Sequence, residues 1–261
     1  MKQSMLIDTT LCMACRGCQT ACKQWNQLPA EKTTFEGTYE NPPHFSGRTW
    51  MKIVFREDEV EDDNGNGYPR WLFSRQGCMH CNDAACEMVC PSGAIYKTEL
   101  GTVKVDESKC ISCNYCVRAC PFNVMGFDRD KGVARKCTFC YDRLVNGYEP
   151  ACSSACSTDA IKTGDRSEMV EEALEKVEHL KKNGNPKANV YGLDEVGGTG
   201  MIYVLADSPE KYGLPKEPEV ALTTRFWNSL FRPLRAVVVV AIAFGLWSNH
   251  ASSKKLQKKD K

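Results

Sequence analysis

The sequence predicts an α+β fold of two nested, cysteine-rich units, with a single transmembrane helix near its C-terminal end. Three observations predict this fold. Sixteen cysteines among 261 residues fall into four groups of four. A short motif recurs after three of these groups. A run of twelve apolar residues, 236–247, lies near the end of the chain.

The third cysteine group has the spacing C-x2-C-x2-C-x3-C-P of bacterial ferredoxins: Cys110, Cys113, Cys116 and Cys120. In that spacing three thiolates surround one iron–sulfur cluster and the fourth ligates a second, so one such run implies a partner run. Disulfides and structural zinc are the alternatives for so many cysteines. No secretory signal is visible in residues 1–10, and zinc sites favour Cys pairs or Cys/His mixtures. The pattern therefore favours clusters.

The first group has the same spacing but lacks the proline: Cys12, Cys15, Cys18 and Cys22. Residues 24–47 predict an irregular connection, which either covers the fold or contacts a partner subunit. Residues 49–56 and 70–75 predict two strands joined by an acidic turn. That turn matches only the start of a calcium loop, because Phe73 stands where the loop needs a glutamate, so we expect a solvated hairpin.

The second group has two extra residues between its middle cysteines: Cys78, Cys81, Cys86 and Cys90. His80 lies inside it and would be superfluous as a ligand, because four thiolates are already present. Residues 94–105 predict a short two-stranded turn through Gly101. The fourth group is divided: Cys137, Cys140, Cys152 and Cys156. Alone it could be a zinc site, but beside the other groups it is better explained as a cluster motif with an inserted loop.

An internal repeat joins the groups. The segment 90–95, Cys-Pro-Ser-Gly-Ala-Ile, recurs as Cys-Ser-Thr-Asp-Ala-Ile at 156–161 and loosely as Cys-Pro-Phe-Asn-Val-Met at 120–125. The middle two groups therefore predict one ferredoxin-like two-cluster unit, inserted into a second unit that the first and last groups form. The expected boundaries are 1–73 and 131–166 for the outer unit, 74–130 for the inner unit, 167–224 for a helix and linker region, 225–250 for an anchor helix and 251–261 for a basic tail.

The remaining segments predict structural elements rather than a catalytic site. Residues 167–183 have the apolar stripe of a packing helix, and 201–206 predict a strand. Residues 197–200, Gly-Gly-Thr-Gly, follow no clear strand and open no helix, so a loop is favoured over a nucleotide site. The net charge of +1 gives no field that would attract nucleic acid. The four histidines fit no catalytic set, so we expect a non-catalytic chain.

The apolar run at 236–247 would span about 18 Å as a helix, which is short of the roughly 30 Å hydrocarbon core. Flanking residues extend it, and Trp227 and Trp247 are suited to the two membrane interfaces. An interfacial or buried helix is the alternative. Five lysines follow and would place the cluster units outside the membrane: Lys254, Lys255, Lys258, Lys259 and Lys261.

Clusters with four cysteine ligands exchange single electrons and transform no substrate. Four of them in one small chain are more than a soluble shuttle needs. They predict a row of carriers between two distant redox centres, with a free-standing polyferredoxin as the alternative.

The four groups, in this order and spacing, resemble the iron–sulfur beta subunit of the molybdopterin (dimethyl-sulfoxide-reductase-type) oxidoreductases. Within that family the chain looks most like the beta subunit of a membrane-bound formate dehydrogenase. The segments that carry this finer resemblance are 15–26 (Cys-Arg-Gly-Cys-Gln-Thr-Ala-Cys-Lys-Gln-Trp-Asn), 76–81 (Gln-Gly-Cys-Met-His-Cys), 196–199 (Val-Gly-Gly-Thr) and 212–215 (Tyr-Gly-Leu-Pro).

The resemblance implies that the fourth cysteine of each group crosses over to a neighbouring cluster. It implies four [4Fe–4S] clusters, with iron held by four cysteine sets. Set 1 is Cys12, Cys15, Cys18 and Cys156; set 2 is Cys22, Cys137, Cys140 and Cys152; set 3 is Cys78, Cys81, Cys86 and Cys120; set 4 is Cys90, Cys110, Cys113 and Cys116.

The resemblance also implies partners for anaerobic respiration. These are a molybdopterin-containing alpha subunit, with molybdenum or tungsten, and a cytochrome b-type gamma subunit that reduces quinone. The C-terminal helix would pack against the gamma subunit in the cell inner membrane, single-pass, with the clusters on the periplasmic side. The inner unit would lie toward the gamma subunit and the outer unit toward the alpha subunit.

The chain departs from the family in two places. Ser157 follows Cys156 where the family usually has proline, and lysines replace an acidic tail. The alternatives are the same relay in a nitrate, polysulfide or dimethyl sulfoxide reductase, or in a membrane hydrogenase.

Overall fold

The computed structural model of the protein describes residues 2–61, 66–226, 228 and 240–247. The chain divides into two units, Met1–Val220 and Ala221–Lys261. In the second unit, residues 222–226 and 240–247 are helical. None of the helices in the described residues combines the length and hydropathy that a membrane span requires. Most of the predicted anchor at 225–250 lies outside the described residues.

A four-stranded sheet in the order β8–β1–β10–β9 organises the first unit. Its strands are β1 (Gln3–Asp8), β8 (Ile161–Asp165), β9 (Asn189–Tyr191) and β10 (Met201–Leu205). β1 pairs in parallel with β10 and antiparallel with β8. The strand predicted at 201–206 is confirmed. It is bonded to the first strand of the chain, so this part of the predicted helix and linker region completes the sheet.

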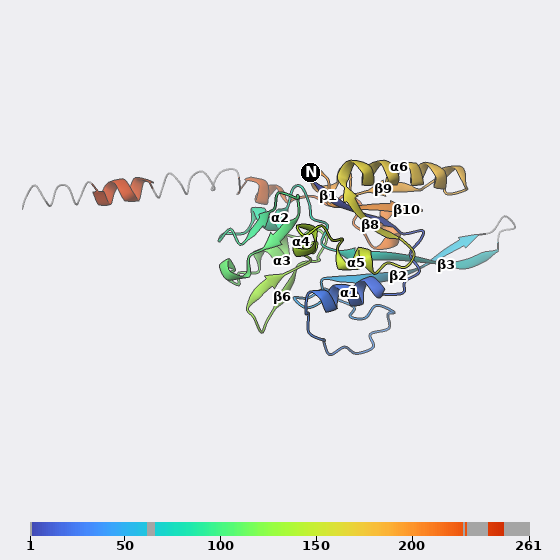
Figure 1. Ribbon diagram of the computed structural model, residues 1–261, viewed down its shortest axis with the longest axis horizontal. Helices are drawn as coiled ribbons and strands as arrows, with labels where there is room; N and C mark the ends of the chain where they lie inside the picture. The colour runs from blue at the N-terminus through green and yellow to red at the C-terminus, as the bar shows by residue number, and fades with distance from the viewer. Residues whose placement is uncertain (1, 62–65, 227, 229–239, 248–261) are drawn as a thin grey trace, which may run out of the picture. The chain divides into compact units, whose positions relative to one another are not determined.

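Side chains alternate between the two faces of this sheet, as the strand geometry requires. Met5 and Ile7 pack with the cysteines on one face, whereas Leu6 packs on the opposite face. Helix α6 (Arg166–Lys182) covers that opposite face (Figure 1). The helix predicted at 167–183 is therefore confirmed. Leu174, which the sequence places on its apolar stripe, is 50% exposed, because it lies about 100° around the helix from buried Ala173.

A long hairpin joins β2 (Met51–Glu61) to β3 (Gly67–Gly77). The two strands pair antiparallel along their whole length and are longer than predicted. The sequence predicted each strand only as far as its apolar residues extend. The backbone pairing continues beyond them, toward the tip of the hairpin, where the side chains are mostly exposed. Figure 1 shows the hairpin reaching away from the rest of the first unit. The start of the calcium-loop match, residues 62–65, lies outside the described residues, whereas Gly67 and Phe73 of that match lie in strand β3.

The cysteine groups lie on loops and short helices, and two small hairpins lie between the groups. The helices are α1 (Gly17–Trp25), α2 (Ala85–Met88), α3 (Tyr115–Ala119), α4 (Tyr141–Leu144) and α5 (Ala151–Ser154). The hairpins are β4 (Ile95–Lys97) with β5 (Val103–Val105), and β6 (Gly126–Asp128) with β7 (Val133–Arg135). Three 3-10 turns complete the unit: η1 (Glu107–Lys109), η2 (Glu195–Gly197) and η3 (Pro209–Tyr212). The two-stranded turn predicted at 94–105 is confirmed.

The internal repeat has a conformational basis. The third residue after the cysteine is left-handed in each copy: Gly93 (φ 67°), Asn123 (φ 53°) and Asp159 (φ 52°). Glycine, asparagine and aspartate are the residues that adopt this conformation most readily. Each turn redirects the chain from the cysteine into a strand, β4, β6 or β8. The repeat is thus the same turn built three times.

The loop between α1 and β2 touches the β6–β7 hairpin backbone to backbone. A Cβ atom on Gly126 of β6 would lie 1.9 Å from the carbonyl carbon of Ser46. A Cβ on Gly47 would lie 2.4 Å from the amide nitrogen of Asp128. Only glycine permits this approach, so both glycines fasten the loop against the β6–β7 hairpin.

Candidate cluster sites

The same backbone bend occurs in all four cysteine groups. The residue just before the second cysteine is left-handed in each: Ala14 (φ 55°), His80 (φ 50°), Ser112 (φ 61°) and Phe139 (φ 61°). None is glycine, so each conformation costs about 1–2 kcal/mol. Such strain concentrates at functional sites, where the surrounding structure holds it in place.

This bend aims backbone N–H groups at sulfur. The amide of His80 lies 3.5 Å from Cys78 Sγ, and the amide of Phe139 lies 3.4 Å from Cys137 Sγ. A backbone hydrogen bond from Ala14 likewise lowers the pKa of Cys12, although burial raises it more. N–H groups directed at sulfur stabilise thiolates, the form that binds iron.

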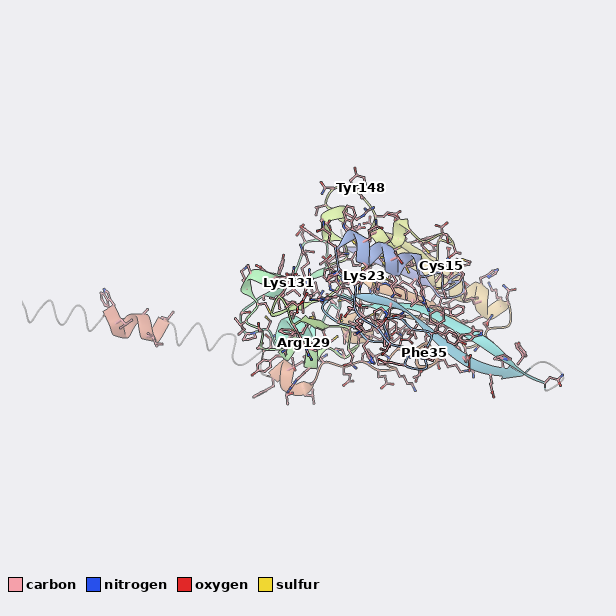
Figure 2. The ribbon with its side chains drawn as sticks, turned by 90° about the horizontal axis from the view of Figure 1, so that it is seen from below. Cys15, Lys23, Phe35, Arg129, Lys131 and Tyr148 are labelled. Carbon is pink, nitrogen blue, oxygen red and sulfur yellow. The ribbon has the colours of Figure 1, made fainter. Side chains whose placement is uncertain are left out.

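The four cysteines of set 1 line one cavity. Cys12, Cys15 and Cys18 come from the loop and first turn of α1, and Cys156 follows α5. Ile7, Ile53 and Ile161 form apolar walls. Burial raises the pKa of the Cys18 thiol to about 12. Cys15 is exposed, so this cavity lies near the surface (Figure 2).

The four cysteines of set 4 line a second cavity. Cys90 comes from the turn before β4, and the third group supplies Cys110, Cys113 and Cys116. Ile95, Val105 and Phe127 line the same cavity. Burial raises the pKa of Cys116 to about 12, and the neighbouring Cys113 and Cys90 thiolates add to this effect.

Sets 2 and 3 are two further groups of neighbouring thiols. Burial raises the pKa of Cys22 well above its usual value, and the charges of Cys137, Cys152 and Cys140 raise it further. All four of these cysteines are buried. In set 3, burial raises the pKa of Cys81, with added effects from Cys78, Cys86 and Cys120. Each group thus brings together cysteines from two different motifs.

All sixteen cysteines lie in the described part of the chain, and none of them forms a disulfide. Within the same residues, no group of three or more His, Cys, Asp or Glu side chains is arranged to hold a single metal ion. The donor sets offer four sulfurs each, N–H groups directed at sulfur, and apolar walls. This chemistry fits a cluster held by four thiolates.

Comparisons with known proteins agree with this chemistry. The model of the 4Fe-4S dicluster domain family matches residues 69–166. The formate dehydrogenase, nitrate-inducible, iron-sulfur subunit of Escherichia coli K12 is 41% identical over 245 residues, which cover 92% of this chain and 82% of the relative. This chain belongs to the family of formate dehydrogenase iron–sulfur subunits.

Two further relatives extend the comparison. The formate dehydrogenase 2 subunit beta (cytochrome c-553) of Nitratidesulfovibrio vulgaris is 33% identical over 220 residues, covering 81% of this chain and 97% of the relative. The thiosulfate reductase electron transfer subunit of Salmonella typhi is 41% identical over 168 residues, covering 63% of this chain and 78% of the relative. The family resemblance expected from the sequence is confirmed.

Two buried cations of this iron–sulfur subunit lie beside the cysteine sets, and the sequence did not point to either. Arg75 is 1% exposed, and its Nη2 atom lies 3.9 Å from Cys137 Sγ. Lys136 is 3% exposed and donates hydrogen bonds to the carbonyl oxygens of Val103 and Cys137. Arginine and lysine are ordinarily exposed, so a sequence offers no signal of their burial beyond closeness to a cysteine.

His80 is committed to the backbone rather than to a metal. Its Nδ1 atom accepts a hydrogen bond from the Val103 amide at 3.0 Å, and its ring meets Phe139 edge-on. Burial lowers the pKa of His80 well below its usual value, so the ring is neutral. The proton therefore lies on Nε2, because Nδ1 is the acceptor.

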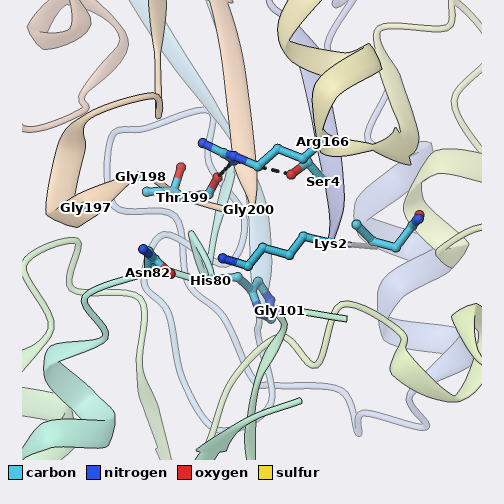
Figure 3. Close-up of a pocket in the computed structure, with 11 residues that line it drawn as sticks. Lys2, Ser4, His80, Asn82, Gly101, Arg166, Gly197, Gly198, Thr199 and Gly200 are labelled. Atoms are coloured by element: carbon cyan, nitrogen blue, oxygen red, sulfur yellow. Dashed lines mark hydrogen bonds between the residues drawn. The ribbon is translucent and has the colours of Figure 1, made fainter. Parts of the chain in front are cut away.

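The glycine-rich loop at 197–200 has no amide free for a phosphate. Its four N–H groups donate to the carbonyl oxygens of Asp194, Glu195, Gly192 and Met79. A small cleft with basic side chains borders the loop (Figure 3). There Arg166 donates hydrogen bonds to the carbonyl oxygen of Thr199 and to Ser4 Oγ, which ties the loop to β1 and α6. The loop is a structural connection between these elements.

Proposed function

We propose that this chain is a non-catalytic electron-transfer subunit that carries four [4Fe–4S] clusters, one in each cysteine set. Each bound cluster supplies a one-electron redox centre with no open iron position. The chain's own residues hold the clusters in sequence, surround them with apolar walls and exclude water. The order of the sets is the observation that carries this proposal.

The sets form an unbroken series. Cys18 of set 1 is an electrostatic neighbour of Cys152 of set 2. Cys78 of set 3 is a neighbour of Cys137 of set 2. Cys86 of set 3 is a neighbour of Cys116 of set 4. Four electron carriers in the order of sets 1, 2, 3 and 4 favour transfer of electrons between two separate partners over storage of electrons within this chain.

The two ends of the series lie near the surface, whereas set 2 is buried. Met13, beside Cys12 of set 1, is 61% exposed. Ile111, beside Cys110 of set 4, is 60% exposed. In the proposed relay, docked redox partners would cover these two exposed apolar side chains. The series therefore supports a relay that is open at both ends.

We propose that the electrons come from formate. A molybdenum- or tungsten-pterin alpha subunit would oxidise formate to carbon dioxide, releasing one proton and two electrons. The chain would pass the electrons singly to a cytochrome b-type gamma subunit, where quinone takes up two electrons and two protons. Set 1 would face the alpha subunit and set 4 the gamma subunit. The thiosulfate reductase relative supports the alternative of the same relay in another oxidoreductase.

Iron analysis tests the cluster assignment. The anaerobically purified chain should be brown and contain about sixteen irons, four for each cubane. Stoichiometric zinc, or fewer than about twelve irons in freshly purified complex, would contradict four clusters. Co-purification with a formate-oxidising subunit separates the leading proposal from the alternatives. A soluble monomer with full iron content would favour a polyferredoxin.

We propose that the C-terminal region anchors the complex in the cell inner membrane as a single span beside the gamma subunit. The described part of its helix exposes Val240, Ile242, Phe244, Leu246 and Trp247. Such a run of apolar side chains needs an apolar surrounding. Deletion of residues 226–261 should release the complex from membranes, whereas deletion of 251–261 alone should not. Membrane-bound activity that survives the longer deletion would contradict the anchor.

We propose that the cluster units lie on the periplasmic side, because lysines follow the apolar run and basic flanks stay in the cytoplasm. Protease added to spheroplasts should therefore cleave the cluster units of this chain. Protection in spheroplasts, with cleavage in inverted vesicles, would reverse the assignment.

A further inference from the structure

Arg75 lies between the first two cysteine sets. It lines the cavity of set 1 together with Cys12, Cys18 and the other cysteines of that set. Its Nη2 atom approaches Cys137 Sγ of set 2 at 3.9 Å. Strand β3 fixes this position, because the backbone carbonyl of Arg75 also accepts a hydrogen bond from Tyr203 Oη at 2.8 Å. The guanidinium therefore borders both sets at once.

No carboxylate balances this charge. Among the described residues, no Asp or Glu forms an ion pair with Arg75, and its Nε and Nη1 atoms have no hydrogen-bond partner. A buried cation without an anion is strongly unfavourable. Arg75 is instead surrounded by sulfur, because its Nη2 atom lies 3.9 Å from Cys137 Sγ and it lines the same cavity as the four cysteines of set 1. The cysteine sets are thus the counter-ion of Arg75.

Lys136 repeats this arrangement between sets 2 and 3. It is buried, follows β7 and directly precedes Cys137 of set 2. Its Nζ atom donates hydrogen bonds to the backbone carbonyls of Val103 and Cys137, and Cys78 and Cys86 of set 3 are its electrostatic neighbours. Among the described residues, no Asp or Glu forms an ion pair with it. The gaps between sets 1 and 2 and between sets 2 and 3 therefore each contain one buried cation.

We propose that Arg75 and Lys136 are fixed positive charges that raise the reduction potentials of the clusters on either side of them. This inference rests on the four-cluster assignment and adds residues that position charge rather than ligate iron. An electron entering a cluster adds one negative charge, so a nearby cation stabilises the reduced form. A cation shared by two clusters also reduces the repulsion between two reduced neighbours. Among the described residues, no buried Lys or Arg is an electrostatic neighbour of Cys90 or Cys116 of set 4, so the set 4 cluster should keep its own potential.

The test is a redox titration of the purified complex followed by electron paramagnetic resonance. Arg75→Gln should lower the reduced-to-oxidised ratio of two clusters at least tenfold at fixed potential, which is about 59 mV for a one-electron couple. Lys136→Gln should also lower two midpoint potentials. The midpoint potential of the set 2 cluster should fall in both variants. The midpoint potential of the set 4 cluster should change in neither.

Two controls separate charge from packing. Arg75→Lys keeps the charge and should change the ratios less than twofold. Arg70→Gln removes an arginine from the same strand, where Arg70 pairs with Asp58 at 2.5 Å and Asp207 at 2.9 Å, and should leave all four potentials unchanged.

The outcomes are decisive in either direction. Loss of clusters from the Gln variants would show that the cations serve cluster assembly, and would contradict the proposal that they set reduction potentials. Unchanged potentials in fully loaded Gln variants, equal shifts of all four clusters, or failure of Arg75→Lys together with Arg75→Gln would overturn it. A wild-type chain without about sixteen irons would instead refute the proposed function, so the two failures are distinguishable.

Discussion

Left-handed residues at the cysteine motifs determine where the sulfurs point. The same bend occurs at Ala14, His80, Ser112 and Phe139, and at His80 and Phe139 the amide of the bent residue is directed at the sulfur of the cysteine two residues earlier. Each bend is strained without glycine's freedom, and the packing of the unit holds it. Single residues of this kind, rather than long elements, shape the candidate cluster sites.

Gly126 determines how closely the loop before β2 approaches the β6–β7 hairpin. Gly126→Ala would place a methyl group 1.9 Å from the carbonyl carbon of Ser46, so the backbone must shift. We expect a loss of about 1–3 kcal/mol, as for other overpacked sites, and a Tm lower by several degrees. Calorimetry at matched iron content measures this. Gly67→Ala, which meets open space, should leave the Tm unchanged. Equal Tm values for the two variants would contradict the close approach.

At the scale of elements, α6 and the four-stranded sheet form a second core beside the cysteine-bearing one. Leu6, Ile202 and Val204 pack against α6, while Met5 and Ile7 face the cysteines. β1 therefore contributes to both cores through alternate residues. The sheet is a rigid wall behind sets 1 and 2, and its stability supports the geometry of the bends.

A substitution at Ala173 tests how closely α6 packs on the sheet. It is fully buried, so Ala173→Leu must displace neighbours and should destabilise the chain by about 1–3 kcal/mol. Leu174→Ala, one residue along on the exposed side, should change stability by no more than about 0.5 kcal/mol. Urea unfolding followed by helix circular dichroism compares the two. A larger loss for Leu174→Ala would show that α6 is rotated from the position described.

At the scale of the whole molecule, the order of the cysteine sets carries the function. The series runs from an exposed cysteine of set 1, through buried set 2, to set 4 beside exposed Ile111. In the proposed relay, burial of set 2 would shield its carrier from water and from adventitious oxidants, whereas the two ends would be available to partners. Loss of a terminal cluster should interrupt transfer at one side only.

Cys113→Ser tests this polarity. The variant should abolish quinone reduction by formate but leave formate oxidation with an artificial dye largely intact, because the dye takes electrons before set 4. Both activities are measured on the same assembled complex. Ser108→Ala, an exposed residue outside the sets, should retain both activities. Equal loss of both activities in assembled Cys113→Ser would contradict the terminal position of set 4.

Structural features formed by residues close together in the sequence could be predicted, because neighbouring residues determine them. The spacing of Cys110, Cys113 and Cys116 defines a loop and a turn of helix, and the apolar period of 167–183 defines α6. The hairpin through Gly101 also depends only on neighbouring residues. The same is true of the turn that follows a cysteine and recurs three times. The family followed from these motifs and is confirmed by the relatives.

Contacts between distant segments required the tertiary structure. Packing brings Cys156 into the cavity of Cys12, Cys15 and Cys18, a set that the family resemblance implied but the spacing of the residues did not, and it inserts β10 between β1 and β9. Burial of Arg75 and Lys136 could not be predicted, because the surroundings of a cation depend on every segment that closes around it. The motifs thus determined what the chain binds, through local spacing. Long-range packing decided which cysteines meet and which charges lie between them.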